Sequence, residues 1–366
     1  MKFGCFVYFQ ERDMPTAQMY REYLDEICYT DRLGFDEVWL AEHHFTDYAT
    51  TPSPNLLLSN IATRTERIRI GSMVNPLPLY DPLRFAEEIA VLDQLSQGRV
   101  NIGIGSGVPS EMQRFGRSAE QAKPRFREAL DVIVRALSQD RFNHHGDFYH
   151  YSDATVTPRP VQLPHPPIFQ GVLSPQSVVT CAEQGIPITR IYDTFDQARS
   201  MTQLYRATVA AQHPHGLTSS LFRPSVRHVR PIYVANTTEQ AFHEAVPELF
   251  RHFRRFADVT DAEHTTPSPD NWRHLVEKAP IPLGPHDFEQ MDAENIVIIG
   301  DPDRVRNKLL HLREHAGMDG FIGIFAFGNL PHEHVCRSLH LFAETVMPSL
   351  PKDADTLRHN APDLAH

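Results

Sequence analysis

The 366-residue sequence has few cysteines, no long apolar run and no concentrated positive charge. Its four cysteines are Cys5, Cys28, Cys181 and Cys336, and no two of them have the spacing of a metal-binding or redox pair. No apolar run is long enough to cross a bilayer, and the first residues carry no secretion signal. We therefore expect buried, reduced thiols and a cytoplasmic protein.

Nucleic-acid binding is disfavoured, because the net charge is −11 and no block of lysine and arginine is present. Hydrophobic residues make up 41% of the chain and charged residues 22%, as in an ordinary globular enzyme. A dinucleotide fingerprint is also missing, since Gly103-Ile104-Gly105-Ser106-Gly107 is followed by Val108 and Pro109 and lacks the required glycine spacing. Glycines at a strand end more often admit a bulky ligand close to the backbone.

Strand-like and helix-like segments alternate along the chain, which predicts parallel strands joined by crossover helices. Eight strands in a chain of this length predict a closed (β/α)8 barrel, with a doubly wound sheet as the alternative. We expect one domain over residues 1–350 and a polar tail over 351–366. The strands are expected at 2–8, 38–41, 67–73, 99–104, 167–171, 186–192, 227–234 and 320–327.

Two proline-rich segments depart from this alternation. The loop Asn75-Pro76-Leu77-Pro78 is expected to lie outside the sheet, because proline cannot donate to a central ladder. The segment from Phe256 to Glu294 has little apolar periodicity, and a structureless run of this size inside a barrel is usually functional or disordered. Since it follows the seventh strand on the catalytic face, we interpret it as a lid-like insertion, with an insertion of no function as the alternative.

The chemistry is expected at Glu42-His43-His44-Phe45, which follows the second strand. Imidazoles titrate near neutral pH, so a pair at the carboxyl end of a strand suits proton transfer. Successive side chains on a strand point to opposite faces. We therefore expect only one of His43 and His44 to enter a given pocket directly, while the other orients it or contacts a loop. A metal site or a pair of surface histidines is the alternative.

Active sites of this barrel gather at the carboxyl ends of the strands. Those ends carry aromatic residues and glycines but few carboxylates, which favours a flat apolar cofactor over the metal ligands or paired acids of a hydrolase. Ser174-Pro175-Gln176-Ser177 opens a helix after the fifth strand. Free N–H groups and hydroxyls there suit a phosphate, and an ordinary N-cap serine is the alternative.

In order and spacing, these motifs resemble the bacterial luciferase family of flavin-dependent monooxygenases from Met1 to about Leu350. Singly the matching motifs are short, and together they are specific. They are Lys2-Phe3-Gly4, Gly34-Phe35-Asp36, Glu42-His43-His44-Phe45-Thr46, residues 71–78 with Pro82, Leu92-Asp93-Gln94-Leu95-Ser96-Gln97-Gly98-Arg99, Phe115-Gly116, Gly300-Asp301-Pro302, and Leu341-Phe342 through Met347-Pro348.

The resemblance implies a two-component monooxygenase that receives reduced FMN from an NAD(P)H-dependent flavin reductase. It would use dioxygen, through a C4a-peroxyflavin, to oxygenate a small, mainly apolar organic molecule. The resemblance also implies His43 as the catalytic imidazole with His44 beside it, Glu42 as a brace, and a dimer formed through helices near the second and third strands. The implied cofactor-binding residues are Met73 and Val74, joined by a non-proline cis peptide, with Asn75, Gly105, Ser106, Ser174 and Ser177.

The sequence departs from the light-emitting members at three positions. Gly105 and Ser106 stand where they have a cysteine and a phosphate-binding arginine, and Leu173 stands in place of a glutamate, so we do not expect light emission. Arg190 and Arg114 are candidates to replace the lost phosphate contact. The alternatives are a deazaflavin (F420)-dependent oxidoreductase of the same fold, a non-catalytic subunit that supports a flavin monooxygenase, and a metal-dependent hydrolase. No metal site is expected, and the sequence carries no readable code for the substrate.

Overall fold

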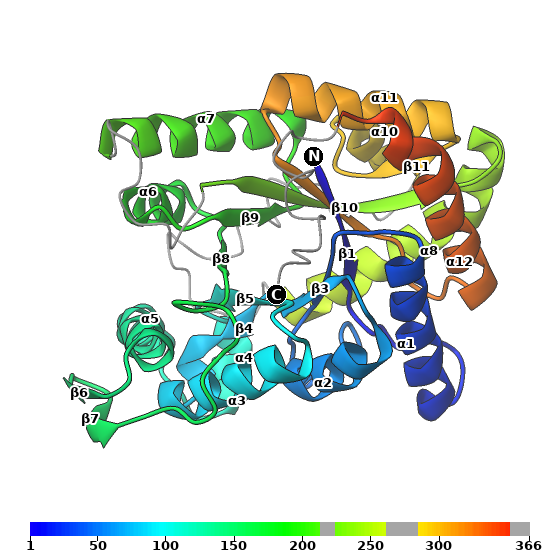
Figure 1. Ribbon diagram of the computed structural model, residues 1–366. Coiled ribbons are helices and arrows are strands. Elements are labelled where there is room, and N and C mark those ends of the chain that lie inside the picture. Colours follow the sequence, from blue (N-terminus) through cyan, green and yellow to red (C-terminus); the bar gives the residue numbers. More distant parts are fainter. Residues whose placement is uncertain (213–223, 261–284, 352–366) are drawn as a thin grey trace, which may run out of the picture.

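Eight parallel strands close into a barrel in the computed structural model, which describes residues 1–212, 224–260 and 285–351 (Figure 1). The last strand of the ring, β9, pairs back to the first, β10, so the sheet has no free edge there. This confirms the predicted (β/α)8 barrel. Around the ring the strands are β10 (Val226–Val234), β12 (Gly320–Ile324), β1 (Lys2–Val7), β2 (Glu37–Leu40), β3 (Arg69–Ser72), β5 (Val100–Gly105), β8 (Ile168–Gly171) and β9 (Ile188–Ile191).

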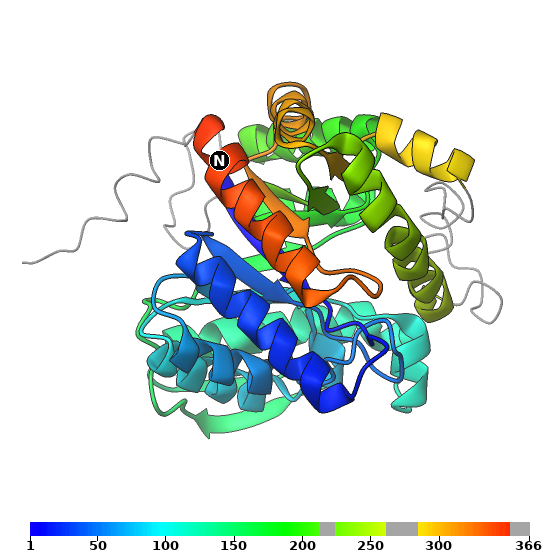
Figure 2. The same ribbon diagram turned by 90° about the vertical axis from the view of Figure 1, so that its right-hand side faces the viewer.

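Helices cover the outside of the barrel (Figures 1 and 2). Their buried residues recur at helical spacing, as in α5, where Phe126, Ala129, Ile133 and Leu137 face the core. Asp81 caps α3 by accepting from two backbone N–H groups. The helices are α1 (Thr16–Arg32), α2 (Pro54–Arg64), α3 (Pro82–Leu95), α4 (Pro109–Arg114), α5 (Ala122–Ser138), α6 (Pro175–Gln184), α7 (Phe195–Gln212), α8 (Thr238–Thr260), α10 (Pro285–Ala293), α11 (Pro302–His311) and α12 (His332–Leu341).

Charged side chains fill the amino-terminal end of the barrel. Arg227 of β10 donates to Glu37 of β2 at 2.7 Å, although two strands lie between them in the ring, so this ion pair crosses the interior. Asn101 links Glu37 to Arg69, and Arg227 also lies 4.1 Å from the centre of the Phe169 ring. Because this layer fills the amino-terminal end, a ligand is expected to enter from the carboxyl ends of the strands.

Two expectations about the strands are corrected. Asn75–Pro76 is a short strand, β4, paired with Ile104 and Gly105 of β5, so these two residues do not lie outside the sheet. The structure also contains a strand that is not among the eight expected ones. This strand, β11 (Ile298–Gly300), pairs with the end of β10 and leads into α11. β4 has two residues and β11 has three, which is too few for an alternation of apolar and polar residues to be recognised in the sequence.

The segment expected to be structureless, 256–294, is helical at both described ends. Residues 256–260 belong to α8, and α10 occupies Pro285–Ala293. The centre of the expected lid, 261–284, lies outside the described residues, as does the expected tail beyond Pro351. Between α5 and β8 the chain forms a hairpin of β6 (Phe142–His145) and β7 (His150–Ala154) outside the barrel sheet. Short 3-10 and π segments are η1 (Leu77–Leu79), η2 (Ala119–Gln121), η3 (Leu312–Ala316), η4 (Phe342–Val346) and η5 (Met347–Ser349).

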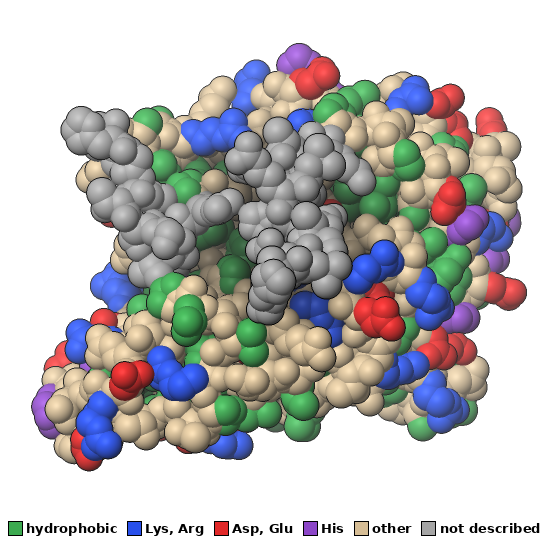
Figure 3. Space-filling model, viewed as in Figure 1, with side chains coloured by type: hydrophobic (Ala, Val, Ile, Leu, Met, Phe, Trp, Pro, Cys, Tyr) green, Lys and Arg blue, Asp and Glu red, His purple; other side chains and the backbone are tan. Residues whose placement is uncertain are grey.

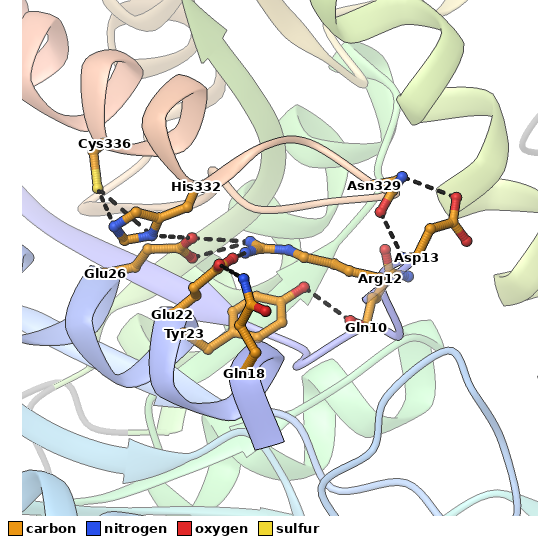
Figure 4. A network of polar contacts seen from close by, with 10 residues as sticks. All are labelled: Gln10, Arg12, Asp13, Gln18, Glu22, Tyr23, Glu26, Asn329, His332 and Cys336. Atoms are coloured by element: carbon orange, nitrogen blue, oxygen red, sulfur yellow. Dashed lines mark hydrogen bonds and ion pairs between the residues drawn. The ribbon is translucent and has the colours of Figure 1, made fainter. Parts of the chain in front are cut away.

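A polar network joins α1 to α12, which lie side by side (Figures 2 and 4). Arg12 donates to Glu22 and Glu26, and His332 of α12 lies 3.0 Å from the same Glu26 carboxylate. Cys336 Sγ is 3.6 Å from His332 Nε2, but burial raises the pKa of its thiol to about 11, so the thiol stays protonated. This network therefore serves to fasten the two helices.

Acidic and basic side chains of the described residues are interspersed on the face drawn in Figure 3. None of the described helices is both long and apolar enough to span a membrane. Within the same residues, no three or more His, Cys, Asp and Glu side chains gather as metal ligands would. All four cysteines are free thiols, three of them buried.

Candidate active site

The predicted site residues follow four strands that are consecutive in the barrel: β2, β3, β5 and β8. Glu42, His43 and His44 follow β2, Met73 to Asn75 follow β3, Gly105 and Ser106 lie at the end of β5, and Ser174 and Ser177 follow β8. Because parallel strands present their carboxyl ends on the same side, these residues share one face of the barrel. The strands are parallel because a helix connects each one to the next, so the sequence of elements is enough to bring these residues to one face.

His43 is paired with a buried carboxylate. Its Nδ1 lies 2.9 Å from Oε1 of Glu111, the first-turn acid of α4, and the same oxygen accepts the backbone N–H of His44 at 3.1 Å. The side chain of Glu111 is only 5% exposed, which holds it in place. A carboxylate at Nδ1 favours the tautomer that carries its proton there. Nε2 of His43 is then left as a base.

His44 is held by a second carboxylate, Glu42. Glu42 Oε1 lies 3.2 Å from His44 Nε2, while its Oε2 accepts from Asn75 at 2.8 Å and from the Tyr80 hydroxyl at 2.6 Å. Burial raises the pKa of Glu42, against the hydrogen bonds from His44, Tyr80 and Asn75 that lower it. These four side chains bind the loop after β2 to the loop after β3.

The two imidazoles point to different neighbours. The His43 ring packs against Tyr48 at 5.4 Å between centroids, whereas the His44 ring meets Phe115 edge-on at 4.8 Å. Phe115 in turn contacts Phe45, and both of these rings are exposed. His43 thus contacts a buried ring and His44 an exposed one. Both residues lie beyond the end of β2 at Leu40, so strand alternation does not explain the difference.

Glycines make room for the segment after β3. The Met73–Val74 peptide is cis, as the resemblance predicts. A Cβ placed on Gly105 would lie 2.4 Å from Cγ2 of Val74, and one on Gly171 would lie 2.8 Å from its Cγ1. Since real Cβ atoms do not approach so closely, glycine at both positions is what lets Val74 lie over the ends of β5 and β8.

The two serines after β8 stand at the start of α6, a ten-residue helix. Ser174 is the N-cap and accepts the backbone N–H of Ser177, and their hydroxyl oxygens are 3.0 Å apart. The N-cap alternative is therefore correct for Ser174. Both side chains are only partly buried, and the contact between them uses one of their two hydroxyl hydrogens, so the other can be donated to a ligand.

Neither arginine candidate presents a free guanidinium beside these serines. Arg190 is buried and donates to both carboxylate oxygens of Asp193, at 2.6 and 2.7 Å, and to the carbonyl of Leu173 at 3.1 Å. It supports the loop before Ser174. Arg114 is exposed and lies over the Phe45 ring.

A second polar cluster lies beyond His43, and we name it the tyrosine cluster: Tyr8, Tyr48, Tyr192 and His252. The Tyr192 hydroxyl is 3.3 Å from that of Tyr8, 3.1 Å from that of Tyr48 and 2.7 Å from Nε2 of His252. All four side chains are buried. Burial raises the pKa of each tyrosine, to about 12 for Tyr8, and lowers the pKa of His252 to about 3. The cluster is therefore uncharged at neutral pH.

The groove between α10 and α11 contains none of the predicted site residues. Arg304 and Lys308 line it, and both pair there with Asp292. Asp301 adds a second carboxylate, so two acids face the two cations, and the groove lies in the outer helix layer.

Comparison with known proteins decides the family. The sequence model of the luciferase-like monooxygenases matches residues 1–320. This chain belongs to that family. An uncharacterized protein of Sinorhizobium fredii is 31% identical to this luciferase-like protein over 332 residues, which is 90% of this chain and 92% of the other. Two named relatives are the oxygenase component of the flavin-dependent trigonelline monooxygenase of Acinetobacter baylyi (28% identical; 66% and 67% covered) and the 4-hydroxyprotoasukamycin monooxygenase of Streptomyces nodosus (26%; 91% and 87%).

Solved structures share the fold of the luciferase-like protein. The monooxygenase RslO1 of Streptomyces bottropensis superposes with a TM-score of 0.82 at 25% identity, covering 95% of this chain and 99% of that one. The oxygenating constituent of 3,6-diketocamphane monooxygenase from Pseudomonas putida, in complex with FMN, has a TM-score of 0.76 at 19% identity and 96% and 99% coverage. An F420-dependent secondary alcohol dehydrogenase has 0.73 at 17%, with 96% and 99% covered. The last two show the fold alone.

Sequence reasoning missed several residues of this luciferase-like site. Glu111 had a local signal, because it lies in the first turn of a helix opened by Pro109 directly after the glycine-rich end of β5. Tyr192 was expected at the mouth of the barrel, because it ends the predicted strand 186–192, but no pattern tied it to Tyr48 or indicated its positive φ of 57°. His252 had no signal, since a histidine within a helix is commonplace.

Proposed function

We propose that this protein is the oxygenase of a two-component system, which takes reduced FMN from a separate NAD(P)H-dependent flavin reductase and oxygenates a small, mainly apolar organic molecule. Support comes from the family and from the A. baylyi relative, which is named as the flavin-dependent oxygenase component of a monooxygenase. The pairing of His43 with Glu111 carries the proposal, because it gives the face predicted to bind flavin an oriented proton-transfer group.

The described residues fit a flat cofactor with a phosphate tail. Val74, seated on Gly105 and Gly171, forms a surface against which a ring system would pack. The N-terminus of α6, with the Ser174 and Ser177 hydroxyls beside its backbone N–H groups, would hold the phosphate. Reduced FMN bound there would supply the electrons that activate dioxygen.

In this proposal the protein controls protons and water. His43, with Nδ1 held by Glu111, accepts or returns a proton at Nε2. The hydrogen bonds that Glu42 accepts from Asn75 and Tyr80 keep the loops after β2 and β3 together, so the position of His43 is preserved. The buried aromatic rings beyond His43 exclude water from its surroundings.

Anaerobic titration with reduced FMN, and separately with reduced F420, tests the cofactor. We expect reduced FMN to bind at least about tenfold more tightly than reduced F420, and Ser174→Ala/Ser177→Ala to weaken FMN binding about tenfold by removing phosphate contacts. His43→Ala should bind FMN normally but alter the oxygen reaction. Tight binding of reduced F420 without binding of FMN would instead assign the protein to the deazaflavin-dependent oxidoreductases. A His43→Ala variant with unchanged oxygen chemistry would favour a non-catalytic supporting subunit.

We further propose a dimer in the cytoplasm. Leu56 of α2 is 72% exposed, and Val91 and Leu95 of α3 are also exposed, which leaves apolar side chains on the two helices that follow β2 and β3. Four free thiols suit a reducing compartment. Sedimentation analysis of the purified protein should give a dimer that Leu56→Glu converts to a monomer, and a wild-type monomer would contradict this part.

A further inference from the structure

We propose that the tyrosine cluster donates a hydrogen bond to a neutral oxygen atom of the substrate, so that the favoured substrates are apolar ring compounds bearing a carbonyl or similar acceptor. This inference rests on the proposed function, because it takes the substrate to bind beside His43. It adds the chemical class of the substrate and the residues that recognise it.

The cluster is at the catalytic end of the barrel. Tyr8 follows β1, Tyr48 lies in the loop after β2, and Tyr192 follows β9, so all three stand at carboxyl ends of strands. His252 reaches them from α8. The Tyr48 ring contacts the His43 ring, which makes the cluster the direct neighbour of the group expected to move protons.

The cluster has one more hydrogen than it can use. Three hydroxyl hydrogens and one imidazole N–H make four donors, and the three contacts centred on Tyr192 use three of them. The fourth lies on Nδ1 of His252, for which the described residues offer no partner, or on the hydroxyl of Tyr8 or Tyr48. A buried donor without an acceptor is costly, so the arrangement is incomplete without an external acceptor.

The charge state selects the kind of acceptor. The three tyrosines and His252 are neutral, so the cluster offers a donor without a positive charge. A carboxylate would lose its hydration without gaining an ion pair there, whereas a carbonyl oxygen needs only one hydrogen bond.

Aromatic rings around the cluster select the rest of the molecule. Phe256 of α8 packs against Tyr48 and Tyr192, at 5.5 and 5.3 Å between centroids, and Phe253 packs against Tyr192 at 5.1 Å. Phe327 contacts His252 from the strand side of the cluster. Such a surface favours a flat or compact apolar frame next to the accepting oxygen.

Binding of two matched probes to the full-length protein tests the inference. The probes are 1-tetralone and tetralin, which share a bicyclic frame and differ in one carbonyl oxygen, and calorimetry gives their affinities. Tetralin is the more apolar, so hydrophobic burial alone would favour it. We expect the wild type to prefer 1-tetralone by about fivefold or more. Tyr48→Phe should remove that preference, because it deletes the cluster hydroxyl beside His43, whereas Tyr192→Phe should keep it, because it releases the Tyr48 hydroxyl from its contact within the cluster. Tyr205→Phe is the control, because it removes a buried hydroxyl that bonds to the Ile186 carbonyl elsewhere in the barrel, and it should keep the preference.

Equal affinity for both probes in the wild type, a preference that survives in Tyr48→Phe or is lost in Tyr192→Phe, or no binding of 1-tetralone would overturn the inference. If a trapped water accepts the surplus hydrogen bond, the wild type should bind both probes with equal affinity. The probes need no flavin, so this outcome is separate from the cofactor titration. Loss of FMN binding with an intact ketone preference would contradict only the monooxygenase assignment.

Discussion

Oε1 of Glu111 lies 2.9 Å from Nδ1 of His43 and, at 3.1 Å, also accepts the backbone N–H of His44. One buried oxygen therefore orients the imidazole and anchors the backbone that carries it.

Replacement of Glu111 by glutamine should change the chemistry more than the fold. The amide keeps the shape but loses the charge that holds the proton on Nδ1, so we expect the His43-dependent step to slow by about 10- to 100-fold. Stopped-flow mixing of the reduced, FMN-loaded protein with dioxygen measures it. His43→Gln alone and combined with Glu111→Gln should give nearly the same rate, because the two residues act as a unit. Additive losses would refute the coupling.

Substitution of Gly105 by alanine should disturb the segment that is expected to contact the flavin. The new Cβ would lie 2.4 Å from Val74 Cγ2, and a β-branched side chain has little freedom to retreat. We expect reduced-FMN affinity to fall about tenfold with about 1–3 kcal/mol of destabilisation. The double variant Gly105→Ala/Val74→Ala removes the colliding methyl groups and should recover much of the stability. Equal destabilisation in both variants would place the clash elsewhere.

Two buried arginines of β10 should respond in opposite ways to methionine. Arg230 is fully buried, the described residues offer no hydrogen-bond partner to its three side-chain nitrogens, and burial lowers its pKa to about 10. Arg230→Met is therefore expected to be neutral or to raise the free energy of unfolding by about 1 kcal/mol. Arg227 is paired with Glu37, so Arg227→Met leaves a buried carboxylate unpaired and should cost about 3–5 kcal/mol. Urea denaturation of both variants measures the difference. Destabilisation by Arg230→Met would contradict this prediction, because it would show that the charge of nearby Asp193 outweighs the cost of burying the guanidinium.

The contact between α1 and α12 should weaken as the pH rises. The hydrogen bond to Glu26 raises the pKa of His332 above its ordinary value near 6.5. A raised native pKa means that the stabilisation is fully present below about pH 6.5 and is lost as the pH rises through the native value. His332→Gln should thus be less stable than the wild type at about pH 6, by at most about 1 kcal/mol because the side chain is 37% exposed, and equal to it at about pH 9. His334→Gln on the same helix is the control, and a pH-independent deficit in His332→Gln would contradict the linkage.

Most of the barrel was predictable because each long strand carries its own signal. The strands at 2–7, 100–105 and 226–234 are continuous runs of mostly buried residues, and the helices between them have a periodic buried face. The two errors of pairing, β4 and β11, involve elements of two and three residues. The bounds expected for the lid-like insertion were too wide, because α8 continues to Thr260 and α10 begins at Pro285.

The sequence by itself determined the order of strands and helices, and with it the set of strand ends where Glu42, His43, Asn75 and Ser174 stand, because hydrophobic periodicity and turn residues act over short distances along the chain. Only the tertiary structure decided which side chains meet there. His43 contacts Glu111 across 68 residues, and Tyr48 contacts Tyr192 across 144. Contacts of this kind depend on how the ring closes and on the course of the loops above it, and no local pattern of residues specifies either.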